Sequence, residues 1–202
     1  MLLELELRPV IALILILLAG CDKETAPKGQ AQPAVSPKQI AARADFGLES
    51  KSGMRAALTY RFAGQKAPEA AFTGAGGRDV TLLDFAGRPL LVNLWATWCA
   101  PCKAEMPTLD ALAVLEKGRL SVIAVSQDLE GSVPVRAFFE KAGIGNLDAY
   151  TDPDNALLSA FGNNVALPTT ILYDSDSREV WRVTGGVEWD DAEMAKLLAE
   201  AT

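Results

Sequence analysis

The distribution of apolar and polar residues divides the chain into three parts. An uncharged apolar run covers residues 10–20, and a polar stretch rich in Pro, Ala, Lys and Gln follows it as far as residue 37. From residue 68 onward, short apolar runs alternate with longer segments in which apolar residues recur at helical spacing. This pattern predicts a folded domain preceded by a segment that has little apolar surface to bury.

The regular part of the chain predicts alternating strands and helices. Residues 90–95 (L-L-V-N-L-W) form an apolar run of the kind found in a buried central strand, and residues 120–126 form the next run. The other predicted strands are residues 80–83, 147–151, 169–173 and 179–183, with residues 54–60 as a short strand or extended arm, and the predicted helices are residues 101–116, 133–142, 155–161 and 190–201. Strands and helices that alternate and end in a hairpin and a helix predict an α/β fold with a mixed central sheet flanked by helices.

Composition and charge narrow the possible functions. The chain has 202 residues, of which 50% are apolar and 22% are charged, so it can form one globular domain plus an appendage. Its formal net charge of −7 disfavours a nucleic acid as the partner, because binding to phosphates needs clustered Lys and Arg. The chain contains no histidine, which excludes Ser-His-Asp and Cys-His catalysis and removes the commonest ligand for zinc and copper. We therefore expect neither nucleic-acid binding nor a metal site.

The apolar run near the N-terminus resembles a bacterial lipoprotein signal. Residues 10–20 are about half of the ~20 residues that a membrane-spanning helix needs, and their length suits the apolar part of a signal peptide. The run ends in L-A-G-C, which resembles a lipobox, so Cys21 is expected to carry lipid. Asp22 then implies retention at the periplasmic face of the inner membrane. The alternatives are an uncleaved anchor, since acidic residues outnumber basic ones before the run, or a buried apolar strand.

Two of the three cysteines form a C-x-x-C motif. Residues 95–107 read W-A-T-W-C-A-P-C-K-A-E-M-P, and the motif follows a predicted buried strand and opens a predicted helix. A helix N-terminus favours the thiolate of Cys99, and Cys102 lies one helical turn later, close enough to form a disulfide with it. Cys99 is therefore expected to attack a substrate disulfide and Cys102 to resolve the mixed disulfide. The alternatives are half of a zinc site, which would lack two of its four ligands, or two inert buried cysteines.

The motif and its surroundings resemble the active-site segment of the TlpA/ResA branch of the thioredoxin superfamily. The resemblance runs from about residue 54 to the C-terminus and includes G-R-P before the central strand, L-P-T around residue 168 and V-E-W at residues 187–189. It implies a thioredoxin-like fold with an N-terminal extension and an inserted strand–helix unit, for which residues 147–151 and 155–161 are the candidates.

The predicted domain organisation combines the N-terminal signal with this resemblance. Residues 1–20 are expected to be a lipoprotein signal peptide, residues 21–58 the lipid-anchor site and a flexible tether, and residues 59–202 the thioredoxin-like domain.

The resemblance also assigns roles to residues near the motif. Glu105 lies where the branch has a characteristic glutamate. A carboxylate one helical turn beyond Cys102 could shuttle a proton to that thiol, and its negative charge would favour a reductant. The alternative is a solvated glutamate on the helix surface. Asn93 occupies a strand position where thioredoxin has a buried aspartate, and we expect a buried amide that bonds to the backbone and transfers no proton.

A cis-proline opposite the motif completes the site that the resemblance implies. Pro168 matches this position, and the backbone beside it would pair with a bound peptide as an added strand. The residues expected to contact the substrate are Trp98, Ala100, Pro101, Leu167, Pro168 and Thr169.

The function expected from these features is a membrane-anchored thiol–disulfide oxidoreductase in the periplasm, without a cofactor and as a monomer. The resemblance implies that it reduces specific protein disulfides during assembly of cytochrome c or of the copper centre of cytochrome oxidase. Its electrons would then come from a membrane donor of the DsbD/CcdA type. The alternatives are an oxidase or isomerase of the DsbA type, or a non-catalytic module that binds copper or protein through two soft thiolate ligands.

Overall fold

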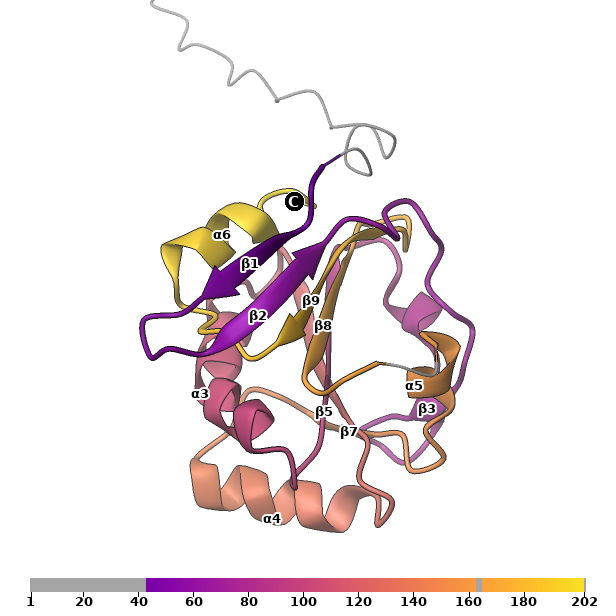
Figure 1. The fold of residues 1–202 in the computed structure, drawn as a ribbon. Helices are drawn as coiled ribbons and strands as arrows, with labels where there is room; N and C mark the ends of the chain where they lie inside the picture. The colour runs from indigo at the N-terminus through magenta and orange to yellow at the C-terminus, as the bar shows by residue number, and fades with distance from the viewer. Residues whose placement is uncertain (1–42, 163–164, 202) are drawn as a thin grey trace, which may run out of the picture. The chain divides into compact units, whose positions relative to one another are not determined.

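A computed structural model describes residues 43–162 and 165–201 of the chain (Figure 1). The predicted signal peptide, Cys21 and most of the predicted tether lie outside the described residues. Within them, no helix combines the length and the apolar composition that crossing a membrane requires.

The described residues contain a sheet of nine strands. Its strand order is β1-β2-β9-β8-β5-β6-β7-β3-β4. The strands are β1 (Phe46–Glu49), β2 (Arg55–Thr59), β3 (Phe72–Thr73), β4 (Asp79–Val80), β5 (Leu90–Trp95), β6 (Ser121–Ser126), β7 (Ala149–Thr151), β8 (Thr169–Tyr173) and β9 (Glu179–Gly185). β5 pairs with β6 and β6 pairs with β7 in parallel, whereas the other neighbours pair antiparallel. The mixed sheet of the predicted α/β fold is therefore confirmed.

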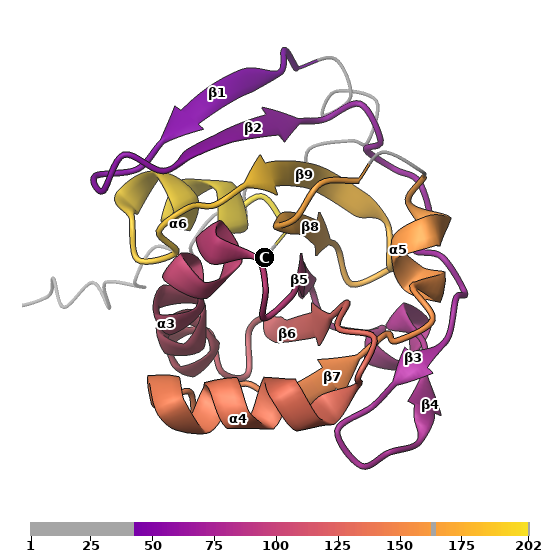
Figure 2. The same cartoon turned by 60° about the horizontal axis from the view of Figure 1, so that its bottom comes forward.

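Helices cover both faces of the sheet (Figure 2). They are the 3-10 helix η1 (Leu82–Phe85) and the α-helices α3 (Ala100–Leu115), α4 (Ser132–Ala142), α5 (Ala156–Ala160) and α6 (Ala192–Leu198). Buried side chains of α3, α4 and α6 join one core cluster, and those of η1 and α5 join a second cluster. The predicted helices are thus present, and α5 follows β7 in the order expected of the inserted strand–helix unit.

The central strand β5 positions the site because it separates these two cores. All six of its residues are buried, and successive side chains point to opposite faces of the sheet. Leu91 and Trp95 belong to the core beneath α3, whereas Val92 and Leu94 belong to the core on the other face. Asn93, which lies between them, therefore faces α3.

The sheet extends beyond the N-terminal boundary expected for the domain at residue 59. β1 and β2 form a hairpin, and β2 pairs antiparallel with β9. β2 lies within the short strand predicted at residues 54–60, whereas β1 is a strand where only a flexible tether was expected. The side chains of Leu48 and Leu58 are buried in the α3 core, which stabilises the hairpin on the sheet. Gly185 of β9 permits this pairing, because a Cβ atom there would lie 2.4 Å from the carbonyl oxygen of Arg55.

The predicted strand at residues 80–83 is divided between two elements. β4 ends at Val80, and η1 begins at Leu82. The Asp84 carboxylate accepts a hydrogen bond from the peptide N–H of Thr81 (2.6 Å) and one from its hydroxyl (3.0 Å). This capping box starts a helical turn and ends the strand early.

Candidate active site

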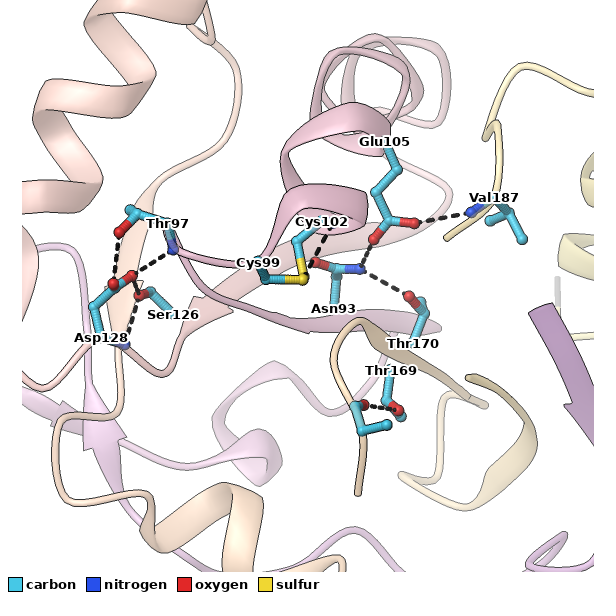
Figure 3. Close-up of a disulfide and its surroundings, with 11 residues drawn as sticks. Asn93, Thr97, Cys99, Cys102, Glu105, Ser126, Asp128, Thr169, Thr170 and Val187 are labelled. Carbon is cyan, nitrogen blue, oxygen red and sulfur yellow. Dashed lines mark hydrogen bonds between the residues drawn. A yellow bond between two sulfur atoms is a disulfide. The ribbon is translucent and has the colours of Figure 1, made fainter. Parts of the chain in front are cut away.

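Cys99 and Cys102 form a disulfide at the N-terminus of α3 (Figure 3). Cys99 is the N-cap residue of the helix, and its Sγ accepts a hydrogen bond from the peptide N–H of Cys102 at 3.3 Å. Pro101 lies in the first turn, where its missing N–H leaves no intrahelical bond unmade. The side chain of Cys99 is 6% exposed and that of Cys102 is fully buried, so only Cys99 reaches the surface.

A buried carboxylate fixes the turn that precedes Cys99. Asp128, at the end of β6, accepts hydrogen bonds from the peptide N–H of Thr97 (2.9 Å), from the Thr97 hydroxyl (2.6 Å) and from the Ser126 hydroxyl (2.6 Å). The sequence analysis did not identify this network. The signal was present, since Thr97 and Asp128 follow neighbouring parallel strands, whose carboxyl ends lie together at one edge of a sheet.

Glu105 is buried beneath the same helix, one turn beyond Cys102. Its side chain has no exposed surface, so the alternative of a solvated glutamate on the helix surface is wrong. Its Oε1 accepts a hydrogen bond from Asn93 Nδ2 at 2.7 Å, and its Oε2 accepts one from the peptide N–H of Val187 at 3.1 Å (Figure 3). Two N–H donors therefore hold the two oxygens from different elements.

Burial controls the protonation of Glu105. Removal from water raises its pKa from 4.5 to about 8, although the hydrogen bonds from Val187 and Asn93 act in the opposite direction. Trp189 lies close enough to favour the carboxylate as well, but its indole N–H makes no hydrogen bond of ordinary length. A pKa near neutrality suits a group that both accepts and releases protons. It also means that the negative charge expected of Glu105 is only partly present at neutral pH.

Asn93 bonds to side chains where a bond to the backbone was expected. It is fully buried, as predicted, but its Nδ2 donates to Glu105 and, at 2.9 Å, to the hydroxyl of Thr170. Thr170 is its partner across the β5–β8 pairing, 77 residues later in the chain. The backbone-bonded amide is therefore wrong, because the register of two strands brings a hydroxyl opposite it.

The peptide bond between Leu167 and Pro168 is cis, as the resemblance implied. The carbonyl oxygen of Pro168 accepts a hydrogen bond from the Gly185 N–H at 2.9 Å, which ties this loop to the end of β9. Leu167 is half-buried, whereas Thr169 is fully buried and its hydroxyl donates to the carbonyl oxygen of Ala166 at 2.7 Å. A substrate beside Pro168 would therefore contact Thr169 through its backbone.

The surface beside Cys99 is apolar and open. Trp98 is 69% exposed, and Ala100 and Pro101 are exposed as well. Leu129 is exposed as well and directly follows Asp128, which binds Thr97; the sequence analysis did not identify it. Residues of this kind next to the reachable cysteine suit contact with an apolar segment of a protein substrate.

Within residues 43–162 and 165–201, no group of three or more His, Cys, Asp or Glu residues could hold a metal ion. The two thiol sulfurs of the motif are joined to each other in the disulfide. The chemistry that this arrangement supports is therefore thiol–disulfide exchange with a buried acid nearby.

Known proteins share this arrangement in sequence and fold. Residues 62–198 match the family model described as Redoxin. The thiol-disulfide oxidoreductase ResA of Geobacillus thermodenitrificans is 31% identical over 129 residues, which cover 63% of this chain and 72% of that protein. The ResA of Bacillus subtilis is 30% identical over 123 residues, which cover 60% and 67%. A Chlorobium tepidum structure described as a thiol:disulfide interchange protein DsbE has a TM-score of 0.59 and 25% identity, over 69% of this chain and 97% of that chain.

Proposed function

This chain belongs to the Redoxin family and, within it, to the TlpA/ResA branch of thioredoxin-like proteins, and from this premise we propose that it reduces protein disulfides outside the cytoplasm. It is a thiol–disulfide oxidoreductase, with Cys99 and Cys102 as its redox pair. The observation that carries the proposed direction is the fully buried Glu105, a proton-exchanging acid one helical turn beyond the buried cysteine.

The exposure of the two sulfurs sets their order of action. Cys99 is the sulfur that a substrate can reach, and it lies at the N-terminus of α3, where the helix dipole and free N–H groups favour a thiolate. The Cys99 thiolate attacks a substrate disulfide, forms a mixed disulfide and releases one substrate thiol. Cys102 then attacks the Sγ of Cys99, releases the second substrate thiol and leaves the disulfide that the structure contains.

Glu105 serves the second step. Cys102 must lose a proton to become a nucleophile, and it is buried away from water. The Glu105 carboxylate accepts this proton, which its pKa of about 8 makes favourable near neutral pH. When the disulfide is reduced again, the same group returns the proton to the Cys102 thiolate.

Trp98, Ala100, Pro101 and the cis-proline loop form the surface that receives the substrate. A client segment in extended conformation would pair with the backbone beside Pro168, and Trp98 would pack against its side chains. The client class implied by the family resemblance is a protein with a cysteine pair destined for a cytochrome c haem or a copper centre of cytochrome oxidase. The electrons would come from a membrane donor of the DsbD/CcdA type.

The location that we propose is the periplasmic face of the inner membrane, with lipid on Cys21. The apolar run that ends in L-A-G-C supports this anchor, and the Pro- and Ala-rich residues after it would give the domain reach from the membrane. Radioactive palmitate fed to cells that express the full chain should label the wild-type protein and not a Cys21→Ser variant. Absence of label from the wild-type protein would refute the lipid anchor.

The reduction potential of the full-length chain in detergent tests the direction of electron flow. The chain is equilibrated in thiol buffers, and alkylation of free thiols reports the fraction reduced. A value between about −270 and −200 mV supports a reductant, whereas a value near −120 mV, like that of DsbA, supports an oxidase. Two variants test the chemistry: Cys99→Ser should abolish exchange, and Cys102→Ser should accumulate a mixed disulfide with its client. If Cys99 and Cys102 show no reversible two-electron transition in these buffers, the proposal fails, and the chain is better described as a non-catalytic binding module.

A further inference from the structure

The side-chain amide of Asn93 has hydrogen-bond partners for its nitrogen but none for its oxygen. Its Nδ2 donates both of its hydrogens, one to Glu105 and one to Thr170. Its Oδ1 is buried and has no hydrogen-bond partner among the described residues. Most buried acceptors in folded proteins have a donor, so this oxygen requires an explanation.

The orientation of this amide follows from its partners. Glu105 accepts from Asn93 on Oε1 and from the Val187 N–H on Oε2, which is the pattern that an ionised carboxylate favours. With Nδ2 committed to Glu105 and Thr170, Oδ1 points away from both. In Figure 3 the Asn93 side chain lies between Glu105 and the disulfide, with its oxygen on the side of the disulfide.

Reduction of the disulfide creates a donor in the same core. Cys102 is fully buried, and it packs in one cluster with Leu91 and Trp95, the residues on either side of Asn93 along the same face of β5. In the disulfide its sulfur carries no hydrogen, but in the reduced protein it carries an S–H group that has no access to water. A buried thiol donor and a buried oxygen without a donor therefore lie in the same core.

We propose that Asn93 is a positioning residue whose Oδ1 accepts a hydrogen bond from the reduced Cys102 thiol while its Nδ2 holds the Glu105 carboxylate. This inference rests on the proposed function and names the residue that aligns its second step. The amide transfers no proton. It fixes the thiol and its base on the two ends of one rigid planar group.

The resolving step is balanced with these groups. Cys102 Sγ forms a bond to Cys99 Sγ, and the bond from Cys99 to the substrate sulfur breaks. As the S–H group rotates away from Asn93 Oδ1, the Cys102 proton passes to the Glu105 carboxylate, and the substrate thiolate takes a proton from water. Two cysteine thiols are oxidised to a disulfide as the substrate disulfide is reduced to two thiols.

Infrared spectroscopy of the S–H stretch tests the hydrogen bond directly. The full chain carries Cys21→Ser and Cys99→Ser, so Cys102 is the only thiol. Its S–H band should lie below that of an unbonded thiol in hexane, and Asn93→Leu, which has a similar volume, should shift the band upward. The matched control is Thr170→Val, which removes the other partner of Nδ2 and leaves Oδ1, and it should leave the band in place. A band at the unbonded position, or one unmoved by Asn93→Leu because the thiol bonds to a helix carbonyl, overturns the proposal.

A second measurement needs no substitution at position 93. The ¹³Cγ resonance of Asn93 is recorded in the otherwise unaltered full chain, oxidised and reduced. It should shift on reduction, and an unchanged resonance overturns the proposal even if Asn93→Leu does not fold.

Stopped-flow kinetics with a protein disulfide connect the bond to function. Asn93→Leu should slow the resolving step about tenfold to a hundredfold and accumulate mixed disulfide, while the first attack by Cys99 keeps its rate. Equal rates for both steps in Asn93→Leu and wild type overturn the positioning role. If wild type itself exchanges no disulfide, the proposed function has failed, and this outcome is distinct from an exchanging wild type with an unaffected Asn93→Leu variant.

Discussion

Replacing Glu105 by Gln should remove a large pH dependence from the stability of the oxidised protein. The carboxyl group is fully buried, and burial raises its pKa from 4.5 to about 8. Between these two values the folded protein keeps a proton that the unfolded chain has already released. Stability therefore falls as pH rises through this window, because rising pH favours the unfolded state, which binds one proton fewer than the folded state.

The magnitude follows from the size of the shift. One pKa unit corresponds to about 1.36 kcal/mol, so a shift from 4.5 to about 8 gives about 5 kcal/mol. This stabilising contribution is complete below pH 4.5 and is lost once the pH exceeds about 8. The Glu105→Gln variant has no proton to lose. Its stability relative to wild type should therefore rise by about 5 kcal/mol between pH 4.5 and pH 9.

The Glu105→Gln substitution should also change the free energy of unfolding by an amount that does not depend on pH. A Gln side chain presents one oxygen and one NH₂ group, but both Glu105 oxygens face donors, from Asn93 and from Val187. One donor must therefore face another donor, which costs about 1–3 kcal/mol at every pH. The quantity that tests the prediction is therefore how the difference in free energy of unfolding between variant and wild type changes with pH, and not the size of that difference at any one pH.

Urea denaturation at pH 5, 6, 7, 8 and 9 provides the measurement, with fluorescence of the buried Trp95, Trp181 and Trp189 as the probe. The disulfide stays intact in both proteins, and all other titrating groups cancel in the difference. Glu140→Gln, at an exposed position of α4, controls for the loss of one formal charge. If the difference between Glu105→Gln and wild type is flat from pH 5 to pH 9, the raised pKa of Glu105 is refuted, and with it the reason for its role as a proton acceptor near neutral pH.

Three further tests, each a substitution studied by urea denaturation, concern the structure around the site, and two of them add a second variant for comparison. Asp128→Ala should lower the free energy of unfolding by about 2–4 kcal/mol and slow disulfide exchange, whereas Thr97→Val, which keeps the peptide N–H bond, should cost less; equal costs would contradict the network. Gly185→Ala should lower the free energy of unfolding by more than about 1 kcal/mol, since φ is 106° at this residue and the added Cβ would clash with the carbonyl oxygen of Arg55 in β2. It should also speed amide hydrogen exchange in β2, and unchanged exchange would contradict this argument. Arg182→Met should lower the free energy of unfolding by about 3–5 kcal/mol, because it leaves the buried Glu179 without its ion-pair partner. Adding Glu179→Gln should restore part of this stability, and a double variant no more stable than Arg182→Met would contradict the argument.

The parts of the fold that the sequence predicts well are those specified by local pattern. β5 has the bounds expected from its apolar run, and α3, α4 and α6 lie within two or three residues of their predicted ends. The C-x-x-C motif is equally local, because a strand, a turn and a helix N-terminus within a dozen residues determine where both sulfurs lie. The β1–β2 hairpin has a weaker signal: the sequence predicts β2 only as a short strand or extended arm and does not predict β1, since the hairpin joins the sheet only by pairing with β9.

The contacts that define the site escape a local pattern because they join distant segments. Asn93 finds Thr170 through the register of β5 against β8, and Glu105 is covered by Val187 from the loop after β9. The spacing of Glu105 from Cys102 identifies the face of the helix that both share, but not whether water reaches that face. The family resemblance predicts a role for Glu105 in proton transfer, but only the packing of the folded chain shows that this residue is buried.

Two carboxylates flank the motif, and their surroundings suit them to different tasks. Asp128 accepts three hydrogen bonds, two from hydroxyls and one from a peptide N–H, and these bonds hold the Thr97 turn in one conformation. Glu105 has two donors, and burial outweighs both, so its charged and neutral forms are close in free energy near neutral pH. A group in that balance can take up a proton when Cys102 becomes a nucleophile and return it when the disulfide is reduced. A buried carboxylate is therefore structural on one side of the motif and chemical on the other, because three donors hold Asp128 and two hold Glu105.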